Sequence, residues 1–381
     1  MCSAERYAMN LYRILNLCLI APVCTAHAAP AEPPAGIFFV KDGQSRGALA
    51  LPETAGHCAT LHDMAPSFSS AATAGDPART AYRKGLRMQR SGRLDEAQQY
   101  FEAAIRKNSL FRNAYIALAD IHRLQQAPEP AKQLLQRLLK LSPEHGAAWE
   151  MLSAIHYGQQ AWEDALTCAF RAQELGVPHM HRLIGLSYAA LNHPAEAAQA
   201  LEKARGEGML NGEDLCRAAR ISAQLEAFEK SVQYYEESLK AGGNPPAVYY
   251  ELGMMYFNMK NYKQAAGAFE QATRSGRPAD ADLYLNLGMA YLKQAAYDDA
   301  ISNLQTASSL RPKDIQVMLN LANAYYKKQD FKLAAIQWNK ILVMQPQNAF
   351  AMFMLGKSYM GYGELLKGQA ICDQALAMGE K

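Results

Sequence analysis

The chain has 381 residues, a length that usually corresponds to two or three globular domains. Hydrophobic residues make up 50% of it and charged residues 20%, a normal balance for a soluble protein in which alanines do much of the packing. The net charge of +3 excludes a basic stripe of the kind that neutralises phosphates, so we expect no nucleic acid partner.

The start of the chain differs from the rest and predicts an export signal. An uncharged, mostly apolar run at 14–23 follows a basic residue, and Ala26 and Ala28 are the small residues that a signal peptidase reads. The run is shorter than the roughly 18 to 20 residues that span a bilayer. Its length therefore favours cleavage before Ala29 over an uncleaved anchor.

We predict that residues 1–28 form a signal peptide and that the protein is exported to the periplasm or cell envelope, or secreted where there is no outer membrane. The sequence leaves open whether this signal is cleaved or acts as an anchor. It also leaves open whether Met1 or Met9 is the true start, because the segment from Met9 is itself a well-proportioned signal.

Residues 29–77 predict a disordered, low-complexity leader or linker. They carry many Ala, Pro, Gly and Ser residues and show no sustained hydrophobic period. Within them, the apolar piece Ile37 to Val40 is costly to leave in water. We expect this piece to form a turn packed on the first repeat and prefer this to a dedicated partner site.

From about residue 78 onward, one unit is copied in tandem. Pairs of small residues twelve positions apart recur at steps of 32 to 35 residues, which predicts a solenoid. The nine pairs are Gly85/Ala97, Ala119/Ala131, Ser153/Ala165, Gly185/Ala197, Ala219/Ser231, Gly253/Ala265, Gly288/Ala300, Ala322/Ala334 and Gly356/Gly368. The predicted solenoid spans 78–379, with units near 78–111, 112–145, 146–177, 178–211, 212–245, 246–280, 281–314, 315–348 and 349–379.

Each unit is predicted to be a helical hairpin. In the unit 246–280, apolar residues recur at spacings of three and four on both sides of a short polar stretch at 258–261, too brief for anything but a turn between antiparallel helices. The small residues then lie where the two helices cross, with Gly253 facing Ala265, because a large side chain would push the backbones apart.

These residues resemble the signature of the tetratricopeptide repeat family. The resemblance is carried by Leu252, Gly253, Tyr256, Tyr262, Ala265, Phe269 and Ala272, and by Leu287, Gly288, Tyr291, Tyr297, Ala300, Ala307 and Pro312. It covers roughly four fifths of the chain, is strongest in the last four units and is weaker in the third to fifth. It implies an all-α fold, a right-handed α-solenoid of about nine helical hairpins with a concave groove.

No part of the sequence predicts catalysis or cofactor binding. The repeats and the leader leave no segment for a catalytic domain, so we predict that the protein is not an enzyme. The only local group of metal-type ligands is His57, Cys58, His62 and Asp63, which lacks the spacing of a metal site. We expect neither a metal nor another cofactor.

The predicted partner site lies in the four C-terminal units. The resemblance implies that the first helix of each unit lines the concave face, and residues spaced four and then three apart share one exposed face of a helix. The predicted groove residues are Tyr250, Met254, Phe257, Leu285, Met289, Leu292, Leu319, Asn323, Tyr326, Phe353, Lys357 and Met360. This apolar, Met-containing groove suits an amphipathic helix or hydrophobic peptide.

Two asparagines extend this site. Asn286 and Asn320 occupy equivalent places in neighbouring units. They are similar to the asparagine ladder by which some tetratricopeptide proteins hold an extended peptide backbone, since each amide can donate and accept. Asparagine is also common on solvated helices, and the sequence does not decide between the two readings.

The carboxylate clamp of chaperone-binding family members is absent from these units. The Lys and Asn positions of such a clamp hold Tyr250/Met254, Leu285/Met289 and Leu319/Asn323 instead. A cytosolic co-chaperone is therefore disfavoured, as it also is by the export signal.

The last hairpin predicts a second contact surface. Without a polar capping helix, its apolar residues are expected to be partly uncovered, which motivates self-association through this end. These residues are Leu365, Leu366, Ile371 and Leu376.

The sequence thus predicts an exported, non-catalytic scaffold that binds a protein or peptide in its groove, in the assembly of a cell-envelope or secretion complex and peripheral to a membrane complex. The alternative is a regulatory or docking subunit of an enzyme complex such as polysaccharide or cytochrome biogenesis machinery.

Overall fold

The computed structural model describes residues 76–378, and every regular element in this range is an α-helix. The described residues form two compact units, which we call the N-terminal unit (76–226) and the C-terminal unit (227–378). The predicted signal peptide, and the predicted leader up to residue 75, lie outside the described residues. The last two residues of the predicted leader belong to the first helix: Asp76 caps it and Pro77 begins it.

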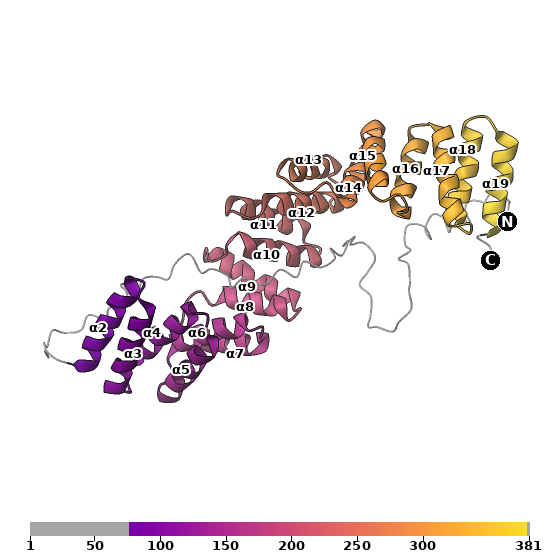
Figure 1. Cartoon of the computed structure of the whole chain (residues 1–381). Helices are drawn as coiled ribbons and strands as arrows, with labels where there is room; N and C mark the ends of the chain where they lie inside the picture. Colours follow the sequence, from indigo (N-terminus) through magenta and orange to yellow (C-terminus); the bar gives the residue numbers. More distant parts are fainter. Residues whose placement is uncertain (1–75, 379–381) are drawn as a thin grey trace. The chain divides into compact units, whose positions relative to one another are not determined.

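Figure 1 shows helices that follow one another in chain order within each unit. The helices of the N-terminal unit are α2 (Pro77–Arg90), α3 (Leu94–Lys107), α4 (Arg112–Leu124), α5 (Pro128–Leu141), α6 (Gly146–Gly158), α7 (Trp162–Glu174), α8 (His181–Ala190), α9 (Pro194–Gly206) and α10 (Gly212–Gln224). Those of the C-terminal unit are α11 (Phe228–Lys240), α12 (Pro245–Asn258), α13 (Tyr262–Arg274), α14 (Ala281–Lys293), α15 (Tyr297–Leu310), α16 (Ile315–Lys327), α17 (Phe331–Met344), α18 (Ala349–Gly361) and α19 (Leu365–Met378).

The predicted all-α repeat fold is confirmed. Consecutive helices pack as hairpins: α2 on α3, α4 on α5, α6 on α7 and α8 on α9 in the N-terminal unit, and the four pairs from α12/α13 to α18/α19 in the C-terminal unit. The predicted turn at 258–261 lies between the end of α12 and the start of α13. The fifth predicted hairpin consists of α10 and α11, which belong to different units and are each described within their own.

Short polar residues fix where many first helices of the hairpins begin. An Asp or Asn side chain accepts a hydrogen bond from a backbone N–H in the first turn, which satisfies a donor that has no partner within the helix. The caps with such a bond are Asp76 on α2, Asn211 on α10, Asp280 on α14, Asp314 on α16 and Asn348 on α18. Except for Asp76, these caps lie in the connection from the preceding helix and so mark where the next repeat begins.

Small residues are required at the helix crossings, as predicted, and a second reason for them emerges. A Cβ on Gly356 would lie 2.7 Å from the carbonyl oxygen of Gly368, so these two backbones approach closely. Side chains also approach these positions: an added Cβ on Gly253 would lie 2.5 Å from the ring of Phe269, sixteen positions later, and one on Gly356 would lie 2.6 Å from the sulfur of Cys372, also sixteen positions later. The same sixteen-residue relationship joins Gly85 to Phe101, Gly185 to Leu201 and Gly288 to Leu304. The small residue therefore makes room for a large core side chain as well as for a backbone.

The turn inside each hairpin contains one residue in the left-handed region. These residues are Gly92, Gln126, Gln160, Asn192, Glu226, Lys260, Ala295, Gln329 and Gly363, all with φ between 58° and 104°. The N–H groups that follow close the helix end; for example, the Asn261 amide donates to the Tyr256 carbonyl at 2.8 Å. Seven of the nine are not glycine, so their backbones carry a conformational cost that the packing of the hairpin offsets.

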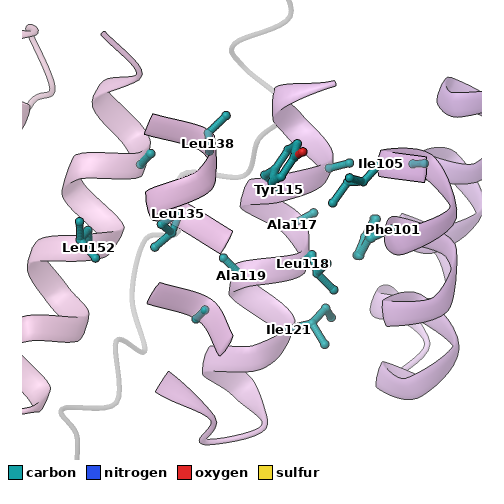
Figure 2. Packing of buried hydrophobic residues seen from close by; sticks show 14 of the residues in the cluster. Phe101, Ile105, Tyr115, Ala117, Leu118, Ala119, Ile121, Leu135, Leu138 and Leu152 are labelled. Carbon is teal, nitrogen blue, oxygen red and sulfur yellow. The ribbon is translucent and has the colours of Figure 1, made fainter. Parts of the chain in front are cut away.

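The core of each unit is built from the inward faces of these helices. Figure 2 shows part of the core of the N-terminal unit, where Phe101, Tyr115 and Leu135 point into the space between neighbouring helices. Trp338 fills the equivalent space in the C-terminal unit and is fully buried. Burial of such side chains supplies most of the stabilisation of each unit. None of the helices within 76–378 has the length and apolar character needed to cross a membrane.

Candidate functional site

The candidate site is the row of first helices in the C-terminal unit: α12, α14, α16 and α18. Besides the second helix of its own hairpin, α12 contacts α14, and α14 contacts α16. The first helices α12, α14 and α16 of successive repeats are therefore direct neighbours, and side chains on the face that they share are brought together from residues more than thirty positions apart in sequence.

The predicted groove residues fall into three groups by burial. Leu285 is only 8% exposed and belongs to the core around Leu304 and Leu321, so it offers almost no surface to a partner. Lys357 is exposed. The other twelve are half-buried: Tyr250, Met254, Phe257, Asn286, Met289, Leu292, Leu319, Asn320, Asn323, Tyr326, Phe353 and Met360. Half-buried apolar side chains pack against the core with one side and leave the other side open to a ligand.

Tyr250 is less open than its position in the sequence predicts. The guanidinium carbon of Arg277 lies 3.6 Å from the centre of its ring, and the ring of Phe269 packs against it with 5.5 Å between centres. Burial raises the pKa of Tyr250 to about 12, with the positive charge of Arg277 acting in the opposite direction. Tyr250 is therefore a covered, neutral phenol at physiological pH.

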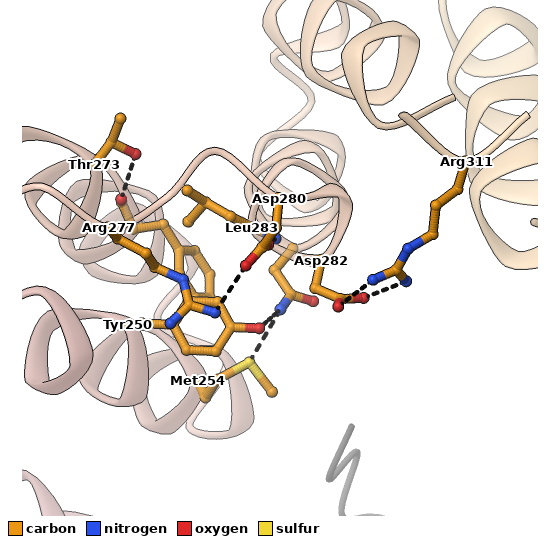
Figure 3. A network of polar contacts seen from close by, with 10 residues as sticks. Tyr250, Met254, Thr273, Arg277, Asp280, Asp282, Leu283 and Arg311 are labelled. Atoms are coloured by element: carbon orange, nitrogen blue, oxygen red, sulfur yellow. Dashed lines mark hydrogen bonds and ion pairs between the residues drawn. The ribbon is translucent and has the colours of Figure 1, made fainter. Parts of the chain in front are cut away.

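Asn286 joins α14 to α12. Its amide nitrogen donates to the hydroxyl of Tyr250 at 2.8 Å and to the sulfur of Met254 at 3.4 Å. Figure 3 shows Tyr250 and Met254 converging on this point from one helix. Three predicted site residues thus form one cluster, and the amide donor that was predicted to serve a peptide backbone has partners within the chain.

Asn320 makes a different bond from its sequence equivalent. Its amide nitrogen donates to the carbonyl of Gln316 at 2.8 Å, one turn earlier in the same helix. The difference follows from the preceding repeat: Leu285, which stands where Tyr250 stands one unit earlier, has no hydroxyl to accept a bond. Asn286 and Asn320 therefore do not form two like rungs in this structure.

Two aromatic residues of the groove are braced by the second helix of their own hairpin. The rings of Phe257 and Tyr262 lie 5.3 Å apart in an edge-to-face arrangement. Tyr326 and Phe331 repeat it at 5.4 Å. Each pair joins the end of a first helix to the first residue of the following helix, so Phe257 and Tyr326 are held in place without being buried.

A repeated arginine and aspartate pair at the entry to the first helices was missed in the sequence. Arg277 and Asp280 in one repeat correspond to Arg311 and Asp314 in the next, with 3.1 Å and 3.6 Å between the charged groups. Arg311 also binds Asp282 through both of its terminal nitrogens, at 2.7 Å and 2.5 Å (Figure 3). The signal that could have found them is their recurrence at the repeat spacing.

In two repeats of the N-terminal unit, the corresponding face carries charged residues that pair with one another. Arg182, which stands in its repeat where Tyr250 stands in the sixth, donates to Asp214 at 2.7 Å, although Asp214 is only 2% exposed. Arg217 donates to the hydroxyl of Tyr157 at 3.0 Å and also pairs with Glu213. These charges bind one another, so the apolar face of the C-terminal unit is the better candidate for a peptide.

Metal ligands and cysteines were the other candidate chemistry of the described residues. No group of three or more His, Cys, Asp or Glu residues between 76 and 378 is arranged to hold a metal ion. The three cysteines in this range, Cys168, Cys216 and Cys372, are buried and form no disulfide among the described residues. Burial raises the pKa of Cys168 to about 11, which keeps this thiol protonated and poorly nucleophilic at neutral pH.

Comparison with known proteins agrees with the repeat architecture. One family model described as a tetratricopeptide repeat matches residues 250–315 and again 285–349, and a second model with the same description matches 89–155. The chain is 24% identical over 204 residues to mouse tetratricopeptide repeat protein 21B, covering 51% of this chain and 15% of that protein. It is 29% identical over 202 residues to the peroxisomal targeting signal receptor of Yarrowia lipolytica, covering 53% and 29%. The chain therefore spans less than a third of the length of these two relatives.

Solved structures give similar matches. A tetratricopeptide repeat protein from Parabacteroides merdae is 19% identical, with 66% of this chain and 99% of that chain covered and a TM-score of 0.43. The C-terminal part of a repeat-containing protein from Cytophaga hutchinsonii is 18% identical, with 59% and 93% covered and a TM-score of 0.47. The helical hairpins, the recurring small residues and the family matches identify this chain as a tetratricopeptide repeat protein.

Proposed function

We propose that the protein is a non-catalytic scaffold that binds a peptide or an amphipathic helix along the shared face of α12, α14, α16 and α18. Solenoid repeat proteins are interaction scaffolds that use extended concave surfaces of this kind. One observation carries the proposal for this chain: the face holds a row of apolar side chains that are packed against the core but half-exposed, among them Met254, Phe257, Met289, Leu292 and Tyr326, with Asn323 and Lys357 as the polar members.

The chemistry of this row defines the ligand. Methionine and leucine adapt to different apolar shapes, whereas the braced rings of Phe257 and Tyr326 give two fixed contact points. An amphipathic helix presents anchors at positions i, i+3, i+4 and i+7, which is the mode of recognition that such a groove suits. The similarity to proteins named peroxisomal targeting signal receptors supports the peptide as a class of ligand, without indicating which peptide this chain binds.

The proposed place of action is the cell envelope, where the scaffold would assemble or stabilise a complex. This part of the proposal rests on the signal-like sequence of residues 1–28. Secretion by a Sec-competent host, with the mature N-terminus determined by sequencing, tests it. An intact N-terminus on protein recovered from the cytoplasm would contradict it.

Two exposed leucines favour self-association as a second interaction. At the start of α19, Leu365 is 62% exposed and Leu366 is 91% exposed. Ile371 and Leu376, predicted to be uncovered with them, are half-buried. Sedimentation of the full chain against a Leu365→Glu, Leu366→Glu variant tests this contact, and a monomer at high concentration for both would dismiss it.

The groove is tested by placing charge on it. The variant carries Phe257→Asp, Tyr326→Asp and Phe353→Asp; Tyr250 is left intact because Arg277 covers it. The matched control is Ile336→Asp, which charges an exposed apolar residue of α17, a second helix of its hairpin. Partners cross-linked to the wild-type chain in its native compartment should be lost with the variant and kept with the control. Recovery of the same partners with the variant would reject the groove.

A further inference from the structure

Arg277 and Arg311 occupy the same position in two successive repeats, yet they have different partners. Each precedes by three residues an aspartate that caps the next first helix: Asp280 accepts from the Leu283 amide at 2.7 Å, and Asp314 caps α16 in the same way. Each arginine also pairs with that aspartate. Up to this point the two repeats are copies of each other.

The repeats differ in a second acid. Arg311 grips Asp282 through two parallel hydrogen bonds, and Asp282 lies six residues before the crossing glycine Gly288. The residue six before the preceding crossing glycine, Gly253, is Ala247. Arg277 therefore lacks the carboxylate that its counterpart has.

The surroundings of Arg277 show the consequence. Its side chain is 16% exposed, against 43% for Arg311, and its guanidinium carbon lies over the ring of Tyr250, 3.6 Å from the ring centre. Its Nε atom is buried and has no hydrogen-bond partner among the described residues. A buried donor without an acceptor is unfavourable, and a guanidinium binds carboxylates through two of its five N–H groups at once.

The charges around Arg277 leave room for one more anion. Asp280 accepts one hydrogen bond from it and one from the backbone of α14. Asp282 lies in the same helix, but its two oxygens are occupied by Arg311. The acid next to Arg277 is thus a single carboxylate with a structural role.

We propose that Arg277 anchors a carboxylate of the bound peptide, which replaces the acid that the next repeat supplies from within the chain as Asp282 and that this repeat lacks at Ala247. The proposal rests on the proposed peptide-binding function and adds the class of ligand: a peptide with an apolar face and an acidic group at the α12 end of the groove. The acidic group is either an Asp or Glu side chain or a C-terminal carboxylate. Arg277 binds this group, and Tyr250 positions the guanidinium by stacking.

The first test supplies the missing acid from within the full-length chain. Ala247→Asp should raise the midpoint of thermal unfolding by about 2–4 °C when Arg277 is present. In an Arg277→Gln background the rise should shrink to what an acidic residue in the first turn of a helix contributes by itself. Ala247→Asn is the uncharged control. Equal rises in both backgrounds would overturn the proposal, because Arg277 would then not be available to a carboxylate at this place.

The second test uses random dodecapeptides displayed on phage and selected on the full-length chain. Selected peptides are synthesised with the acidic side chains as amides, or with the C-terminal carboxylate as an amide. One of these changes should weaken binding about tenfold or more, as expected for the loss of a charge-assisted hydrogen bond. The change that weakens binding shows whether the carboxylate belongs to a side chain or to the C-terminus. The effect should disappear on Arg277→Gln and on Ala247→Asp, and be reduced on Arg277→Lys, which keeps the charge but not the paired donors.

Different results would reject the carboxylate anchor at Arg277 and the peptide-binding groove. If neither neutralisation weakens the selected peptides, but the variant with Phe257→Asp, Tyr326→Asp and Phe353→Asp does not bind them, the carboxylate anchor is rejected and the groove stands. If that groove variant binds them as well as the wild-type chain does, or if no peptide is selected, the proposed function itself is rejected and the anchor with it.

Discussion

The amide of Asn286 donates a hydrogen bond of 2.8 Å to the hydroxyl of Tyr250 and so ties the first helices of two successive repeats together. The two residues are 36 positions apart and were each predicted as separate contact points for a peptide. Their pairing means that Asn286 presents its oxygen, but not its nitrogen, to a ligand. A peptide that uses this residue donates an N–H to it, unless the bond to Tyr250 opens first.

Removing the hydroxyl of Tyr250 should destabilise the C-terminal unit. Tyr250→Phe leaves the amide of Asn286 without its oxygen acceptor, so we expect a loss of about 1 kcal/mol in the free energy of unfolding. Urea denaturation measures it. The matched control is Tyr249→Phe in the same helix, for which the expected change is within about 0.5 kcal/mol. Equal losses in the two variants would contradict the role of the bond.

Tyr250 should also produce a dependence of stability on alkaline pH. Its pKa is about 12 in the folded chain because of burial and 10.0 in an ordinary tyrosine. Above pH 10 the unfolded chain therefore loses this proton while the folded chain keeps it, so stability falls between pH 10 and pH 12 and then levels off. The free energy of unfolding should fall by about 1–3 kcal/mol over this interval, because one pKa unit corresponds to about 1.4 kcal/mol.

This pH dependence is measured by comparing the wild-type chain with Tyr250→Phe. The variant should lose less stability across the same interval, and the difference in tyrosinate absorbance between the two should titrate near pH 12. Tyr291, whose pKa burial and Glu270 raise to about 12, contributes equally to both proteins and cancels. A difference titration centred near pH 10 would show that Tyr250 is not buried.

Alanine substitutions at Gly253 and Gly267 should change stability in opposite directions. A Cβ on Gly253 would lie 2.5 Å from the ring of Phe269, so Gly253→Ala should destabilise the C-terminal unit by about 1–3 kcal/mol. Gly267 lies on an exposed side of α13 with no atom within 4 Å of an added Cβ. Gly267→Ala should therefore stabilise by about 0.5–1 kcal/mol through the better helix propensity of alanine. Denaturation of both variants checks the signs, and two changes of the same sign would be inconsistent with the packing described.

Glycine at a left-handed turn position should increase the stability of the C-terminal unit. Ala295 has φ 60°, where a Cβ is unfavourable, so Ala295→Gly should raise the free energy of unfolding by about 0.5–1 kcal/mol. The control is Ala370→Gly at an exposed position inside α19, where glycine should cost about 1 kcal/mol. Thermal or urea unfolding distinguishes the two. A loss at both positions would show that the turn is not held in the left-handed region.

Most of the fold was predictable because it depends on the spacing of apolar and small residues that are close together in the sequence. Apolar residues at spacings of three and four define each helix, and recurrence of the small pairs defines the hairpins without any knowledge of distant contacts. The left-handed turn residues were not predictable, since most are not glycine and only the hairpin geometry demands the conformation. The contact of Gly253 with Phe269, sixteen residues later, depends on which core side chain enters the crossing, and the helical period alone does not specify it.

The candidate site was predictable in outline and not in detail. Helical phase puts Met254, Phe257 and Tyr326 on an exposed face of the first helices, and in the structure these side chains are half-buried. Helical phase also predicts Leu285 as a groove residue, although its side chain is buried in the core. Burial of a residue depends on the neighbouring repeat as well as on its own helix, and one sequence period does not contain that information.

The sequence by itself determined the helices and their succession as hairpins, because these follow from residues within about one repeat of each other. Only the tertiary structure decided what the face shared by the first helices presents. Tyr250 is covered by Arg277 and hydrogen-bonded to Asn286. In the next repeat, Arg311 binds Asp282 instead of covering a groove residue. The physical reason is that hydrogen bonds and stacking act over a few ångströms, so identical positions in successive repeats behave differently once a single neighbour such as Ala247 or Asp282 changes.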